Sequence, residues 1–277
     1  MEMLKFYFLN IVVGCLMAVT LGHYGIHLVG RRKTLETLMI GQTMQLGIIL
    51  GAFLTSLFFH NTGVIHEEHI GLIVSLLLSG FIYFCHGQCS KKWYYLKTEL
   101  SLLVIILSIA FSHVLTAVNP LIESHLVRSF VGDIVTASKM ENYFILLITF
   151  LCGVYFFLNK KRILDESIDY GLYGHILNKK AVLFEFVIFV IMCLCIHVFG
   201  LLFTLGMLLI PIIAFNMIGN FKYSKMLFVI ALINILSVCL GFLLNIQFEK
   251  LPTSPVIVIL LTGLYGILII KKSLLKL

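Results

Sequence analysis

Histidine side chains occur at two places where their spacing could bind a metal ion. His23 and His27 lie four residues apart in an apolar segment, so a helix would place both on one face. Imidazole is a ligand for most transition metals, and ionisable residues inside apolar spans are often functional. The pair could therefore line a metal path, or each histidine could pack against a neighbouring helix with one hydrogen bond.

A polar loop contains the second group of histidines. The segment HNTGVIHEEHIG includes His60, His66, Glu67 and His69, and it has no Lys or Arg. His66 and His69 are three residues apart and could share a metal ion on a short turn. This loop either attracts cations to the protein or is an ordinary solvated connection.

Softer ligands lie in the apolar segments. Cys193 and His197 would share a helix face, and Cys85 and Cys89 are four residues apart, a combination that suits zinc or copper(I). The chain has seven cysteines, an odd number, and most of them fall in apolar segments, which argues against a disulfide framework. Ordinary packing as small apolar side chains is the alternative for all of them.

The composition indicates which elements must position these residues. The 277 residues are 60% hydrophobic and 12% charged, with a mean hydropathy of +1.07. In a soluble domain roughly a quarter of the residues are charged. Apolar runs such as AVLFEFVIFVIMCLCIHVFG are continuous rather than alternating, which predicts spanning helices and not a barrel. We therefore expect an all-α, polytopic integral membrane protein whose residues 1–277 form a single transmembrane domain.

About nine transmembrane helices are expected, the first of them at the N-terminus in place of a cleaved signal peptide. They are predicted near 5–29, 37–58, 70–87, 99–117, 142–158, 181–199, 202–218, 226–245 and 254–270. In this topology, loops on one side hold 16 of the 20 Lys and Arg residues. Because basic loops stay in the cytoplasm, the N-terminus is expected outside and the C-terminus in the cytoplasm. Topology thus accounts for the net charge of +7, and no nucleic-acid partner is expected.

Two further segments could carry function. Gly200 and Pro211 interrupt one long apolar run, as in the broken helices of transport sites or in a simple packed kink. The longest cytoplasmic loop, residues 159–180, is either a solvated connector or a docking helix for a cytoplasmic partner. No GxxxxGK[ST] motif occurs, so any ATP would be bound by a separate chain.

Three ordered stretches resemble the permease subunits of the bacterial zinc/manganese/iron ABC importers. The first has glycines, a pair of arginines and further glycines in the family's order, at Gly22, Gly25, Arg31, Arg32, Gly47 and Gly51. The stretch FGLLFTLGMLLIPIIAF is similar at Gly200 and Pro211, and FEKLPTSPVIVILL is similar at Pro252 and Pro255. A weaker match is VGDIVTAS, residues 131–138.

The resemblance implies a multi-pass protein of the bacterial cytoplasmic (inner) membrane that transports a metal and is not an enzyme. The implied partners are a second copy in a homodimer, a cytoplasmic ATP-binding subunit and an extracytoplasmic metal-binding protein, all beside membrane lipid. No cofactor is expected in this chain, since ATP would be used by the partner subunit. The family's coupling helix falls in the segment 159–180, which contains Asp169, Gly171 and Gly174. The implied cargo is zinc or manganese, or else iron.

One departure from the family concerns the substrate. The second span of such permeases carries an aspartate and, four residues later, a histidine, and these positions are Leu38 and Gln42 here. Leucine cannot bind a metal, and a glutamine carbonyl is a poor zinc ligand. With Pro211, these positions match the family's translocation path without keeping its ligands. Two alternatives stay open: a permease of the same architecture for a different substrate, and a histidine-dependent membrane enzyme built on HEEH.

Overall fold

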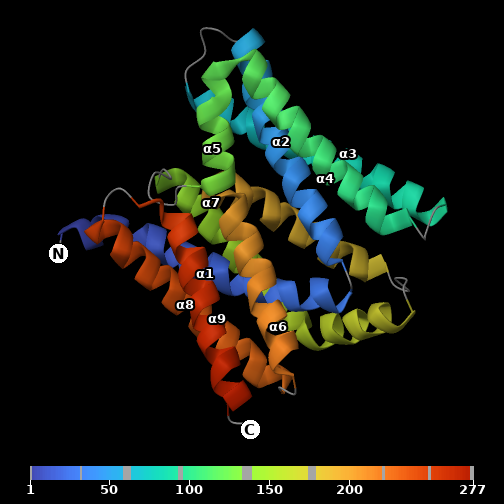
Figure 1. Cartoon of the computed structure of the whole chain (residues 1–277), viewed down its shortest axis with the longest axis vertical. Helices are drawn as coiled ribbons and strands as arrows, with labels where there is room; N and C mark the ends of the chain where they lie inside the picture. Colours follow the sequence, from blue (N-terminus) through green and yellow to red (C-terminus); the bar gives the residue numbers. More distant parts are fainter. Residues whose placement is uncertain are drawn as a thin grey trace. The chain divides into compact units, whose positions relative to one another are not determined.

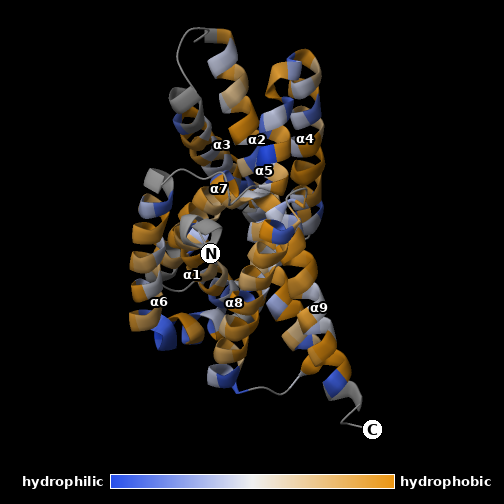
Figure 2. Ribbon diagram, turned by 90° about the vertical axis from the view of Figure 1, so that its left-hand side faces the viewer, coloured by the Kyte–Doolittle hydropathy of each residue, from blue (hydrophilic) through white to orange (hydrophobic). Residues whose placement is uncertain are grey.

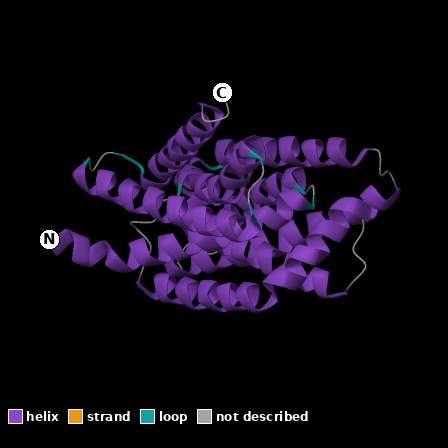
Figure 3. Cartoon of the chain, turned by 90° about the horizontal axis from the view of Figure 1, so that it is seen from below, coloured by secondary structure: helices purple, strands orange, loops and turns teal. Residues whose placement is uncertain are grey.

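A computed structural model describes residues 2–31, 33–58, 64–92, 96–132, 139–173, 179–219, 222–248 and 251–274 of the chain. Within these ranges the regular elements are helices, without any strand (Figure 1, Figure 3). They are α1 (Glu2–Gly30), α2 (Thr34–Phe58), α3 (Val64–Lys92), α4 (Lys97–Val118), the short η2 (Pro120–Ile122), α5 (Glu123–Val131), α6 (Lys139–Tyr173), α7 (Lys179–Ile218), α8 (Tyr223–Gln247) and α9 (Thr253–Leu274). The expected all-α fold is confirmed.

Eight of the described helices are long and apolar enough to cross a membrane, which confirms the expected polytopic membrane protein. In Figure 2 the long helices are coloured hydrophobic over most of their length. Large apolar side chains such as Leu77, Ile106 and Phe157 are exposed, as side chains that face lipid are. Helix α5 has nine residues and would reach about 14 Å, which is too short to cross a hydrocarbon core of about 30 Å.

The sixth and seventh expected spans form one element, α7, which is interrupted at Gly200, where φ is 82°. The ring of Phe184 lies 5.4 Å from that of Tyr24, and the carbonyl of Leu208 lies against Gly25, the next residue of α1. A straight helix would hold Phe184 and Leu208 about 36 Å apart. The chain therefore turns back between them, and the non-helical Gly200 permits the turn, as two separate crossings require.

The helices divide into two compact units. The first unit comprises Met1–Arg32, Asp133–Ile191 and Leu202–Leu277, and the second comprises Lys33–Gly132 and Met192–Leu201. The expectation of a single permease domain stays a prediction.

In the first unit, α1 packs against both α6 and α8. Gly14 faces Val238 of α8, whereas Gly22, two turns later in α1, faces the earlier residue Ile230. The two helices are therefore antiparallel, and the glycines let them approach closely, as small residues do in membrane bundles.

Buried amides reinforce the first unit. Asn142 Nδ2 on α6 donates a hydrogen bond to Asn10 Oδ1 on α1, at 3.1 Å. Asn234 Nδ2 on α8 donates to the carbonyl oxygen of Ala18, at 2.7 Å. In an apolar environment such groups need partners, so these bonds help to fix the order of the three helices.

In the second unit, α2 packs against α3, α4 and α5. Gly47 and Gly51 face the backbone of α3 at Ser75 and Gly71, so closely that an added methyl group would overlap it. Ser75 Oγ also donates to the carbonyl oxygen of Met44, at 2.8 Å. The close approach of α2 and α3 explains why this segment of the sequence is rich in glycine.

Candidate functional site

The histidines of the first span are hydrogen-bonded inside the first unit. His27 is fully buried, and its Nδ1 and Nε2 atoms lie 3.0 Å from Ser167 Oγ and 3.2 Å from the Tyr223 hydroxyl. His23 Nε2 lies 3.2 Å from the carbonyl oxygen of Leu227. In this conformation His27 has no ring nitrogen left for a metal ion. The metal-path interpretation of this pair stays a prediction.

The histidine-rich loop is only partly described. His60 lies outside the described residues, as do the side chains of His66 and Glu67, while His69 is exposed near the start of α3. Among the residues that the structure describes, no three His, Cys, Asp or Glu side chains group closely enough to hold a metal ion. The role of this loop in attracting cations is thus untested.

The positions matched to the family's ligands lie on α2, beside a cavity in the second unit. Leu38 and Gln42 are half-buried on one helix face. Gln42 lines a cavity of about 310 Å³ together with Gln45, Ser112 and His113, and apolar side chains of α4 and α5 complete its wall. Helix α2 therefore brings a predicted path position to a mostly apolar cavity that has a few polar groups, within the membrane-spanning region.

Three of these polar residues were not anticipated from the sequence. Gln45 lies three residues after Gln42 and so shares its face, a spacing that could have revealed it. Ser112 and His113 interrupt the otherwise apolar fourth span. His113 is exposed on α4. Since an imidazole facing lipid is unfavourable, this face of α4 is suited to protein or to a water-filled path.

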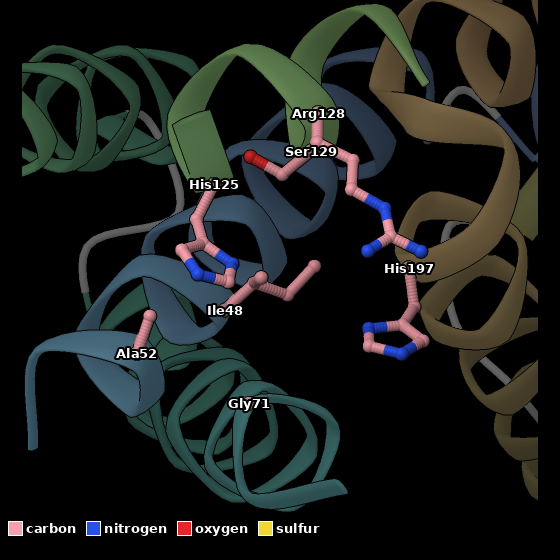
Figure 4. A pocket seen from close by; sticks show the side chains of 7 residues that line it. All are labelled: Ile48, Ala52, Gly71, His125, Arg128, Ser129 and His197. Carbon is pink, nitrogen blue, oxygen red and sulfur yellow. The ribbon is translucent and has the colours of Figure 1, made fainter. Parts of the chain in front are cut away.

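A second, smaller cavity lies between α5, α7 and the α2–α3 pair, all within the second unit (Figure 4). The guanidinium of Arg128 points toward His197. The cavity measures about 20 Å³, which is room for about one water molecule. An arginine cation beside it opposes binding of a divalent cation, so a water molecule fits this cavity better. Its lining residues are Ile48, Ala52, Gly71, His125, Arg128, Ser129 and His197.

The cysteines form no metal centre with the described histidines. Cys193 is buried, and its Sγ atom lies 3.4 Å from Ser75 Oγ, whereas His197 lines the small cavity. Cys85 is half-buried and Cys89 is exposed near the end of α3, both as free thiols. These positions favour packing over metal binding for Cys193.

The break in α7 is held by a contact between two glycines. Gly200 (φ 82°) lies against Gly132 (φ 70°), the residue that follows α5, and a Cβ atom on either would overlap the other's backbone. Left-handed φ values and this close approach both require glycine. The predicted interruption at Gly200 is confirmed, while Pro211 is buried within the second half of α7.

The predicted coupling segment begins as helix rather than loop. Helix α6 continues without interruption to Tyr173, so Asp169 is exposed on its last turns and Gly171 is helical. Gly174 lies outside the described residues. The prediction that this segment contacts an ATPase is untested.

The comparisons with known proteins agree with this arrangement. The ABC 3 transport family matches residues 3–272. PsaBC from Streptococcus pneumoniae, solved in complex with Fab, has a similar fold, with a TM-score of 0.73 and 14% identity, covering 96% of this chain and 92% of that one. A structure described as an inward-facing conformation of a putative metal-chelate type ABC transporter has a TM-score of 0.65 and 18% identity, covering 95% and 85%. No curated protein matches the sequence.

These identities are low, so the two solved structures show a shared fold. The family match covers nearly the whole chain and identifies a transport protein of the membrane. The prediction of transport rather than catalysis is confirmed, and the histidine-dependent enzyme is set aside.

Proposed function

Because the chain belongs to the ABC 3 transport family, we propose that it is the transmembrane permease subunit of an importer that moves a divalent metal ion, zinc or manganese or else iron. The membrane is the bacterial cytoplasmic membrane, with the N-terminus outside and the C-terminus inside, as the distribution of Lys and Arg favours. The sequence resemblance to metal-importer permeases supports this cargo, and the fold shared with PsaBC supports the permease architecture.

The proposed partners follow from the family and from the chemistry of the chain. An ABC permease works with an ATP-binding subunit, and this sequence has no phosphate-binding motif of its own. An extracytoplasmic protein delivers the metal. The acidic, histidine-rich loop at residues 60–69 attracts the metal cation electrostatically. A second copy of the chain completes a homodimer.

The cavity beside Gln42 is the observation that carries the proposed path. It lies in the second unit on the helix where the resembling permeases have their ligands, and it collects two amides, a hydroxyl and an imidazole in an apolar surrounding. Desolvating a divalent ion is very costly unless polar groups replace its water. A homodimer that covers the exposed His113 would place the polar groups of both copies on one path and would remove an imidazole from lipid.

A second candidate is a permease for a substrate that brings its own metal ligands. The described polar lining of the cavity includes no carboxylate or thiol, and its neutral amides are poor zinc ligands. A volume of about 310 Å³ exceeds the needs of a bare ion and lies within the range of small-molecule pockets. Neutral hydrogen-bonding groups in a roomy cavity suit a metal chelate or a polar solute.

Uptake measurements separate the two candidates. The chain is co-produced with its proposed partners, an ATPase and a binding protein, and uptake of radioactive zinc and manganese is compared with uptake of the same ions presented as chelates. Saturable, ATP-dependent uptake of the free ions supports the metal importer. Uptake of chelates alone, with none of the free ions, supports the second candidate and contradicts the first.

A variant sharpens this experiment. Leu38→Asp combined with Gln42→His restores the ligand types of the resembling family at a spacing of one helical turn. In a free-ion importer with a changed site, the double variant increases the affinity for zinc. In a chelate permease the added charge and imidazole bring no gain in uptake of the free ion. The matched control is Ile40→Asp with Met44→His, which keeps the spacing on the opposite face of α2.

A further inference from the structure

Arg31 is a buried cation at the end of α1, in the first unit. Its side chain has no exposed surface, and its Nη1 atom donates a hydrogen bond to Glu185 Oε1, at 3.2 Å. Its Nε atom donates to Ser167 Oγ, at 3.3 Å, and its guanidinium carbon lies 4.7 Å from the centre of the Phe184 ring. A buried arginine held in this way needs its carboxylate partner, because an unpaired charge would be strongly unfavourable there.

The acidic residues around Arg31 belong to the segment 159–180, which is proposed to dock the ATPase, and to the helix that follows it. Glu166 is on α6, inside that segment, and Glu185 is on the first turns of α7, after it. Glu166 Oε2 lies 4.0 Å from Arg31 Nη2, which is too far for a hydrogen bond. One arginine therefore faces both the docking segment and the helix that follows it.

The two carboxylates are held unequally by Arg31. Nη2 is buried and has no hydrogen-bond partner among the described residues, although Glu166 is the carboxylate nearest to it. A shift of about 1 Å would turn this 4.0 Å approach into a charge-assisted hydrogen bond. The geometry thus offers two arrangements, with one carboxylate bonded to Arg31 or with both.

Arg31 also stands beside the point where the chain passes from the first unit to the second. Two residues later, Lys33 Nζ donates to the Tyr83 hydroxyl of α3, at 3.4 Å, and Glu36 forms an ion pair with Lys97. The turn between α1 and α2 is therefore anchored by polar contacts within each unit. A displacement of the docking segment that pulls on Arg31 acts directly on this turn.

We propose that Arg31 is a positioning residue that couples the ATPase-docking segment to the turn between α1 and α2. In one conformation of the transporter Arg31 is hydrogen-bonded to Glu185 alone, and in the other it is hydrogen-bonded to both Glu185 and Glu166. This inference rests on the proposed function as an ABC permease. The planar fork of a guanidinium can serve two carboxylates at once, whereas a lysine ammonium is a single point charge. Arg31→Lys therefore keeps the charge and removes the ability to bond both carboxylates at once.

The test uses the complete complex of permease, ATPase and binding protein in proteoliposomes. In Arg31→Lys we expect assembly and ATP hydrolysis within about twofold of the wild type and a melting temperature close to that of the wild type, while the substrate moved per ATP falls about tenfold. Glu166→Gln should show the same uncoupling. Lys222→Gln is the control, because Lys222 is a cation of the same unit that is exposed just before α8 and lies outside the docking segment. That control should leave coupling unchanged.

Parallel loss of assembly, ATP hydrolysis and transport in Arg31→Lys would mean a merely structural role and would overturn the proposal. Unchanged transport per ATP in that variant would overturn it as well.

A second readout needs no substrate. Cys89 is the only one of the seven cysteines that is exposed, and it lies on α3 in the second unit, so maleimide labels it preferentially. Trapping ATP in the ATPase should change this labelling rate in the wild type and in Lys222→Gln, but not in Arg31→Lys. The coupling role is contradicted if the labelling rate of the wild type does not change with nucleotide, or if Arg31→Lys shows the same change.

A wild-type complex whose labelling rate changes with nucleotide but that moves no metal overturns the proposed cargo and leaves the role of Arg31 supported.

Discussion

The two compact units differ in what surrounds the polar side chains of their apolar helices. In the first unit, such side chains bond to one another, as His27 does with Ser167 and Tyr223. In the second unit, some are bonded in the same way, as His86 is to Ser101, but the polar side chains of Gln42 and His113 line a cavity. Side chains that are already engaged in structure cannot bind a passing substrate, whereas those that line a cavity can.

This difference also separates two kinds of histidine that look alike in the sequence. His27 and His113 both lie in apolar helices, and only the packing around them distinguishes a structural group from a candidate ligand. The first unit is suited to holding its helices and the docking segment in place. The second unit is suited to contact with the substrate.

The largest expected effect is on the glycine contact of the second unit. Gly200→Ala places a Cβ against the backbone of Gly132 at a left-handed φ, and backbone atoms cannot move aside as side chains do. We expect the free energy of unfolding to fall by about 3 kcal/mol or more, or the protein to fail to fold. Yield and SDS-induced unfolding measure this loss.

Gly219→Ala is the control, because its φ is also positive, at 64°, but among the described residues no atom beyond the chain neighbours lies within 4 Å of the added methyl group. It should lose only about 1–2 kcal/mol. Equal losses in the two variants would show that the glycine contact adds nothing beyond the backbone conformation.

The second largest effect is expected from a loss of hydrogen bonds in the first unit. His27→Ala removes an imidazole that is bonded through both nitrogens and leaves a space among aromatic rings. We expect the free energy of unfolding to fall by about 2 kcal/mol, with uptake per folded molecule unchanged. Loss of uptake at unchanged stability would instead place His27 on the metal path and would break the contrast between the units.

The opposite pattern is expected at the cavity. His113→Ala removes an exposed imidazole, so stability should change by less than about 0.5 kcal/mol. Uptake should fall about tenfold, which corresponds to about 1.4 kcal/mol, because a group that contacts the substrate is lost. Thr98→Ala serves as the control, because Thr98 is another exposed polar residue of α4 and does not line the cavity. If His113→Ala transports at the wild-type rate, this cavity is not the path.

The sequence predicted the fold better than the site, for a physical reason. Apolar runs about 20 residues long dictate spanning helices, and Gly200 was recognisable as a break because glycine interrupts such a run. Which face of a helix meets a cavity depends on its neighbours. His113 is therefore invisible as a candidate until α2, α4 and α5 are assembled, and the hydrogen bonds of His27 come from residues 140 and 196 positions away.

The smallest expected effect tests whether the first-span histidines form a pair. His23 Nε2 has one hydrogen bond, to the carbonyl oxygen of Leu227, and its ring stacks on Phe156 at 5.6 Å. Single hydrogen bonds between membrane helices contribute about 0.6 kcal/mol on average, so His23→Ala should cost about 1 kcal/mol or less and leave uptake unchanged. If the two histidines shared a metal, the double variant would lose no more uptake than either single variant, and both singles would already be impaired. Two structural histidines instead give additive losses of stability and three variants with wild-type uptake per folded molecule. Whether uptake per folded molecule falls or stays at the wild-type level therefore decides between the metal-path interpretation of α1 and the structural one.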